Sequence, residues 1–233
     1  MTLVPQNNKI DFPTFSVNRW FAWAPGLDSQ DKWLNWYING SQPLTQDGTD
    51  PSMEFLPVEM RKRLSSLTKI SLWLAFNILS KQELSSTYTV FASRHGESRF
   101  TIELLQQIFK KETLSPMAFS RSVHNTSSGI FGIAAGNSAA STSISACENT
   151  FSMGMLQASI ALTRYEQVLY VMADDKLHSD FVQYVNEPWG KYGTAFLLRS
   201  GKEQFLLKED PLLPPSVLFL QTQLSKHLYG GNS

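Results

Sequence analysis

Cys147, the single cysteine of the chain, is the residue whose type best suits covalent chemistry. It follows a segment of alternating polar and apolar residues, Ser141 to Ser145, and helical spacing resumes through Phe151 and Met155. This pattern predicts a strand that runs into a helix. Because the unpaired N–H groups and the positive dipole end of a helix favour a thiolate, a cysteine at this junction would suit a nucleophile.

The neighbours of Cys147 also support a structural interpretation. Glu148 brings a carboxylate next to the thiol, which disfavours the thiolate, and Phe151 indicates a filled rather than an open channel. An activated thiol also needs a base, for which His124 and His95 are the candidates. Since the sequence does not bring either histidine within reach, a catalytic thiol and a buried structural cysteine both stay open.

Composition excludes several classes of protein. The 233 residues are 42% apolar, enough for one large domain with a sizeable core. Twenty basic and twenty acidic side chains give a net charge of zero, which indicates neither a nucleic-acid partner nor an anionic membrane. One cysteine excludes an intramolecular disulfide and a thiol zinc site, so we expect no metal and no cofactor.

The N-terminus gives no sign of export. MTLVPQNNKIDF lacks both a basic region and an apolar region of the kind that signal peptides have. No stretch of about 18 apolar residues occurs, so no membrane span is predicted. We expect a cytoplasmic protein.

Hydrophobic periodicity predicts strands and helices in alternation. A first strand runs from Phe15 to the turn at Pro25-Gly26, and an insertion loop at about 27–56 carries Trp33 and Trp36 on a short helical turn. Further strands are predicted at 88–93, 141–145, 167–173 and 194–199, and helices at 57–81, 99–111, 128–136 and 214–229. This order predicts one layered α/β unit.

The segment SPMAFSRSVHNTSSGIFGIAAG, with Pro116, Asn125 and Gly129, resembles the part of β-ketoacyl synthases that precedes the nucleophile strand. STSIS and the following Ala146-Cys147 pair resemble the elbow of these enzymes, in which a cysteine attacks an acyl thioester. The resemblance covers nearly all of the chain. It implies an α/β fold, a single N-terminal half of the thiolase-like fold over residues 1–233, with a mixed five-stranded sheet and helices on both faces.

The same resemblance implies a protein that does not catalyse condensation alone. In the family, two histidines and a lysine from the second half polarise the thioester, and the similarity does not extend to that half. The chain looks like a chain-length-factor-like partner of aryl polyene and polyketide ketosynthases. We therefore expect a non-catalytic subunit that pairs with a full-length β-ketoacyl synthase in a heterodimer and shapes the acyl-chain pocket. Glu148, Phe151 and Met155, spaced to share a helical face below Cys147, would line that pocket.

Two surfaces are expected to bind partners. In the thiolase arrangement the strand before the nucleophile lies at the sheet edge and pairs across a two-fold axis, which would put Thr142, Ser143, Ile144 and Ser145 at the interface. A basic cluster on the helix at 57–81 is either a solvated face or a contact for the acidic acyl carrier protein that bears the growing chain. The cluster comprises Arg61, Lys62, Arg63 and Lys69.

Two other functions stay open. The chain could be a free-standing cysteine acyltransferase or thioesterase in which His124 activates Cys147. It could also be a scaffold that binds acyl carrier protein without contributing to any pocket.

Overall fold

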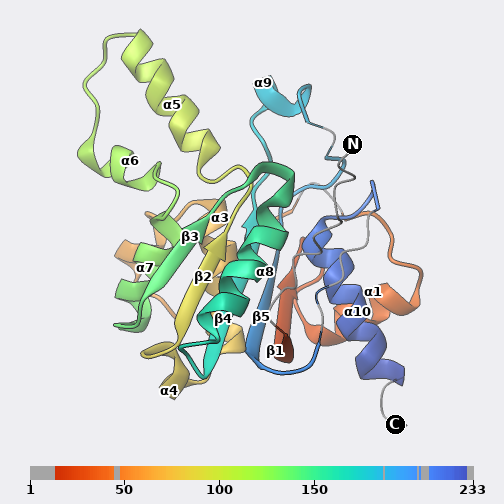
Figure 1. Ribbon diagram of the computed structural model, residues 1–233. Helices are drawn as coiled ribbons and strands as arrows, with labels where there is room; N and C mark the ends of the chain where they lie inside the picture. Colours follow the sequence, from red (N-terminus) through yellow and green to blue (C-terminus); the bar gives the residue numbers. More distant parts are fainter. Residues whose placement is uncertain (1–13, 45–47, 186, 204, 206–209, 230–233) are drawn as a thin grey trace, which may run out of the picture.

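The computed structural model describes residues 14–44, 48–185, 187–203, 205 and 210–229. A five-stranded sheet forms its centre, with the strand order β1-β5-β4-β2-β3 (Figure 1). The strands are β1 (Phe15–Trp23), β2 (Tyr88–Ala92), β3 (Ser141–Ile144), β4 (Gln167–Asp174) and β5 (Tyr192–Ser200). Each of the five strands predicted from the sequence is present.

The sheet is mixed. Strand β2 is parallel to both β3 and β4, whereas β5 is antiparallel to its two neighbours, β4 and β1. Parallel strands need crossover helices, and these cover both faces of the sheet. Since β2, β3 and β4 run in one direction, their carboxyl ends meet at one edge of the sheet, at the top of Figure 1.

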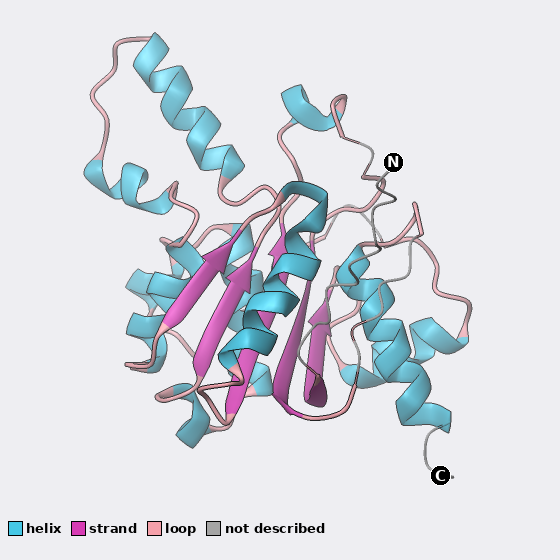
Figure 2. Ribbon diagram, in the orientation of Figure 1, coloured by secondary structure: helices cyan, strands magenta, loops and turns pink. Residues whose placement is uncertain are grey.

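Helices lie on both faces (Figure 2). One face is covered by α8 (Thr150–Ala161), α10 (Pro215–Tyr229) and α1 (Gln30–Ile38), and their buried residues form one hydrophobic core. The other is covered by α3 (Ser66–Ile78) and α7 (Thr126–Ala135), which form a second core. The structure therefore confirms the predicted fold class, an α/β fold like half of a thiolase.

The single long helix predicted at 57–81 is wrong. The chain forms α2 (Val58–Arg61), α3, and then α4 (Lys81–Leu84). Ser65 interrupts the helix because it adopts extended backbone angles and its hydroxyl accepts a hydrogen bond from the backbone N–H of Thr68, 2.8 Å away. Such a cap satisfies an N–H group that the first turn of a helix leaves unpaired. The predicted apolar stripe is nevertheless buried along α3.

The segment at 27–56 contains more structure than an insertion loop. Its nine-residue helix α1 begins after Ser29, whose side chain accepts from the N–H of Lys32. Trp33 is fully buried and meets Trp36 edge to face at a centroid distance of 5.2 Å. The tryptophan pair therefore fixes this segment against the α10 side of the sheet.

Two helices stand away from the sheet. Helix α5 (Ser98–Phe109) and helix α6 (Pro116–Arg121) form an arm beyond the top of β2 (Figure 1). A short helix, α9 (Ser179–Val182), lies at the same end of the molecule. In the part of the chain that the structure describes, no helix is long and apolar enough to cross a membrane.

Candidate functional site

Cys147 lies on a tight turn between β3 and α8. The turn is a 3₁₀ segment, η1 (Cys147–Asn149), and Cys147 has a positive φ of 50°. Thr150 holds it closed, because its hydroxyl accepts from the N–H of Ala146 at 2.9 Å and donates to the carbonyl of Cys147 at 2.7 Å. Positive φ is strained for a residue with a Cβ, and such strain is common at functional turns. The thiol is exposed.

A buried carboxylate organises the loop that follows β2. Asp174, at the end of β4 and 4% exposed, accepts hydrogen bonds from the Ser93 hydroxyl at 2.7 Å and the Arg94 N–H at 2.8 Å. The phenol of Tyr192 donates to its second oxygen at 3.3 Å. Burial raises the pKa of Asp174, although the hydrogen bond from Ser93 and the charge and backbone N–H of His95 act in the opposite direction.

Arg94 and His95 connect this loop to two other segments. The Arg94 guanidinium binds Glu187, in the loop before β5, and lies 2.6 Å from Glu148, the neighbour of Cys147. His95 Nε2 lies 2.7 Å from the same Glu187 carboxylate. The Ser145 hydroxyl, just before the turn of Cys147, also joins the turn to this loop, because it donates to the Arg94 carbonyl at 3.0 Å.

His95 is placed to carry a positive charge. Burial lowers the pKa of His95, but the hydrogen bond with Glu187 and the charges of Asp174 and Glu187 outweigh burial and the repulsion from Arg94, so the pKa rises above its usual value. We call Arg94, His95, Glu148 and Glu187 the charged clamp.

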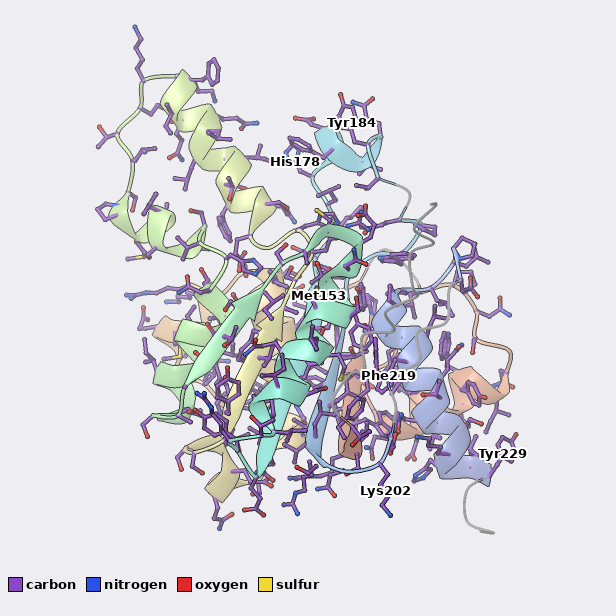
Figure 3. The ribbon with its side chains drawn as sticks, viewed as in Figure 1. Met153, His178, Tyr184, Lys202, Phe219 and Tyr229 are labelled. Carbon is purple, nitrogen blue, oxygen red and sulfur yellow. The ribbon has the colours of Figure 1, made fainter. Side chains whose placement is uncertain are left out.

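The four histidines have other surroundings than the Cys147 thiol in this arrangement. Among the described residues, no hydrogen bond joins Cys147 to a histidine. His124 is exposed and lies beside Gly96, where an added Cβ would sit 3.0 Å from its Nδ1. His178 caps α9 (Figure 3), and His227 is exposed on α10.

The prediction that Glu148, Phe151 and Met155 share one face is wrong. Phe151 and Met155 are 1% and 0% exposed inside the core, where the Phe151 ring stacks on Tyr170 at 5.5 Å. The Glu148 side chain is 74% exposed. Because α8 begins only at Thr150, Glu148 belongs to the 3₁₀ turn and does not follow the helical spacing.

The predicted interface residues lie on an edge strand. Strand β3 pairs with β2 on one side, and among the described residues no strand pairs with its other side. The Thr142 hydroxyl bonds Tyr88 at 2.6 Å on the α8 face, and the Ser143 hydroxyl bonds Ser128 of α7 at 3.0 Å. Side chains therefore hold both faces of β3, while its backbone edge stays open.

The three family-motif residues lie along the helices that lead to β3. Pro116 is in the first turn of α6, whose cap is Ser115, and Asn125 precedes α7. Gly129 is exposed on α7, and an added Cβ there would meet no atom within 4 Å. No atom in the described part of the chain therefore approaches α7 closely at Gly129.

Sequence reasoning missed the charged clamp. Arg94 comes just after the apolar strand β2, and Asp174, which accepts from the Arg94 N–H, ends the apolar strand β4, the parallel neighbour of β2. Polar residues at the carboxyl ends of such strands commonly form sites, so this signal was available. The sequence around Glu187 gives no such signal, because this residue lies in an irregular loop. Within the described ranges, no three His, Cys, Asp or Glu side chains gather to hold a metal ion.

These features fit the family that the chain resembles. The family model of the β-ketoacyl synthase N-terminal domain matches residues 33–225. The chain therefore belongs to the β-ketoacyl synthase N-terminal domain family. No curated protein matches its sequence.

Solved structures agree. A structure of the ketosynthase ApeO in complex with its chain length factor ApeC, from Xenorhabdus doucetiae, matches with a TM-score of 0.80 and 26% identity over 91% of both chains. The ishigamide ketosynthase/chain length factor matches with a TM-score of 0.65 and 15% identity, covering 83% of this chain and 64% of that one. A β-ketoacyl synthase from Burkholderia phymatum matches with a TM-score of 0.57 and 10% identity, covering 81% and 59%. The last two likenesses show the fold alone, and this chain spans less than two thirds of theirs.

Proposed function

We propose that the chain is a non-catalytic, chain-length-factor-like subunit that pairs with a full-length β-ketoacyl synthase in aryl polyene or polyketide-type biosynthesis. The observation that carries the proposal is the open backbone edge of β3. An uncovered edge strand invites pairing and aggregation, and native proteins usually cover it. A partner subunit with an equivalent strand would add to the sheet through main-chain hydrogen bonds.

The surroundings of Cys147 support the non-catalytic part of the proposal. The thiol has no histidine partner, and Glu148 beside it is held by Arg94. A nucleophilic cysteine needs a neighbouring base or a cation that stabilises its thiolate. Here Arg94, the cation that contacts the neighbouring Glu148, is already paired with two carboxylates, so the working cysteine would belong to the partner.

A pocket-shaping role falls to exposed residues of the same turn. Phe151 and Met155 fill this chain's own core and leave no surface for a second subunit. The turn Cys147–Asn149 is exposed, and Met153 is half-buried on the outer part of α8 (Figure 3). We assign the wall of the partner's acyl pocket to these residues.

Only part of the basic cluster supports a contact with acyl carrier protein. Lys69 is occupied because it pairs with Asp50 at 3.0 Å. Lys62, which makes an exposed pair with Glu59 at 3.2 Å, and the exposed Arg63 lie around α2, next to an apolar groove lined by Met60 and Ile133, among others. Cations that border an apolar groove suit an acidic amphipathic helix, which is the chemistry expected of a carrier protein.

The test compares this chain alone, the ketosynthase alone and the two proteins together in a condensation assay with malonyl and acyl thioesters on acyl carrier protein. The ketosynthase is the full-length enzyme encoded nearest to this chain in its genome. We expect no product from this chain alone, and long polyene or polyketide product only when both proteins are present. Carbon–carbon bond formation by the chain alone would contradict the proposal and favour an enzyme that uses Cys147.

A further inference from the structure

The arm formed by α5 and α6 presents an apolar surface that this chain does not cover. Five large apolar residues are between 48% and 90% exposed, namely Leu105, Ile108, Phe109, Met117 and Phe119. In α5 only Leu104 is buried, although apolar residues recur there at helical spacing. Single apolar residues on a protein surface are ordinary. A group of them along the solvent-facing side of an amphipathic helix marks a binding surface.

The arm keeps a defined shape without resting on the sheet. The guanidinium of Arg121 in α6 lies 4.3 Å from the ring centroid of Phe100 in α5. The Ser115 hydroxyl caps α6 by accepting from the N–H of Ala118. The arm's exposed apolar residues are therefore held in place before any partner binds, which lowers the entropy cost of binding.

The arm lies on the same flank as the open edge of β3. Helix α6 is followed directly by α7, and α7 is joined to β3 through Ser128 and Ser143. On α7 the side chain of Ile133 is 75% exposed. In Figure 1 the arm, α7 and β3 follow one another down one side of the molecule. The arm thus continues the surface to which we assigned the partner.

The size of β3 makes a second contact region necessary. Its four residues reach about 13 Å at about 3.3 Å per residue. Stable subunit interfaces bury about 800 Å² or more on each partner, and obligate ones more than that with an apolar centre. A short strand edge whose side chains face their own helices cannot provide such a centre. The arm provides exposed apolar area of the required kind.

We propose that the α5–α6 arm docks on the same ketosynthase subunit that pairs with β3, and that its apolar residues form the central hydrophobic contact of the complex. This inference rests on the proposed function. Lys110 and Lys111 follow Phe109 at the tip of the arm. The surface of the ketosynthase that receives the arm is therefore apolar and bordered by acidic groups.

A photo-crosslinking experiment tests the placement. p-Benzoylphenylalanine replaces Phe109, which is 90% exposed, in the chain co-expressed with the ketosynthase encoded nearest to it. The matched control carries the same probe at Tyr184, which is 75% exposed just after α9 and outside the arm (Figure 3). We expect irradiation to join the ketosynthase to the Phe109 variant and not to the Tyr184 variant.

A binding measurement supports the crosslinking. Phe109→Asp should weaken the complex at least tenfold, and Tyr184→Asp should change its affinity less than twofold. An intact complex with no crosslink at position 109 and unchanged affinity would overturn the inference while leaving the proposed function in place. A crosslink from position 109 to a second copy of this chain would also overturn it. If the unsubstituted chain forms no complex with the ketosynthase, the proposed function itself fails, and the inference fails with it.

Discussion

The guanidinium of Arg94 lies 2.6 Å from the carboxylate of Glu148, the residue that follows Cys147. The same guanidinium binds Glu187, so one side chain joins the loop after β2, the turn after β3 and the segment before β5. These segments are distant in sequence and meet because β3, β2, β4 and β5 lie in this order across the sheet. The charged clamp thereby sets the shape of the surface around Cys147.

Removing the guanidinium of Arg94 from the charged clamp should destabilise the protein. Arg94→Ala leaves Glu187, whose side chain is 11% exposed, without its guanidinium partner. Glu187 keeps its contact with His95, but breaking an ion pair at this depth costs more than breaking an exposed one, so we expect a loss of about 2 kcal/mol in the free energy of unfolding. Urea denaturation measures this loss. The control is Lys32→Ala, which breaks an exposed pair with Asp28 and should cost less than about 0.5 kcal/mol. Equal losses in the two variants would contradict a structural role for the clamp.

The clamp should also make stability depend on pH. Because the pKa of His95 is raised in the folded protein above its ordinary value of 6.5, the folded state holds the proton more tightly than the unfolded state. Its contribution is fully present below about pH 6.5 and is lost as the pH rises through the higher folded pKa. Unfolding free energies measured at intervals between pH 6 and pH 9 should therefore fall for the natural chain. In His95→Gln the decline should be smaller, and an identical decline would show that His95 does not cause it.

Phe151 should behave as a core residue. Its ring packs against Tyr170, Phe196 and Phe219, so Phe151→Ala would leave a cavity. We expect a loss of about 3–5 kcal/mol in unfolding free energy and less recovered protein. Met153→Ala, on the half-buried part of α8, should cost about 1 kcal/mol or less. If the Phe151 variant keeps its stability and lengthens the product of the complex, the core assignment is mistaken.

The thiol of Cys147 should be dispensable for condensation. We expect Cys147→Ala to keep the activity of the ketosynthase complex within about twofold, since the side chain is exposed and no described histidine forms a hydrogen bond with it. Initial rates with and without the substitution decide this. A loss of a hundredfold or more would move the chemistry to this chain and would revive the cysteine acyltransferase or thioesterase as its function.

The apolar runs of β2, β4 and β5 were readable in the sequence, because buried strands leave a continuous hydrophobic signal. The turn at Cys147 was also predictable, since strand spacing gives way to helical spacing there. The break at Ser65 was missed because a local hydrogen bond competes with an apolar stripe that continues through it. The clamp was missed for a different reason. Arg94 and Glu187 are 93 residues apart, and only the order of the strands brings them together.

The composition of the complex tests the central claim most directly. The chain is co-expressed with the full-length ketosynthase encoded nearest to it, purified through a tag on this chain alone, and weighed by native mass spectrometry. We expect a one-to-one heterodimer that buries more than about 2,000 Å² and does not dissociate on dilution to nanomolar concentration. Recovery of this chain as a stable monomer, with the ketosynthase left as a separate homodimer, would contradict it.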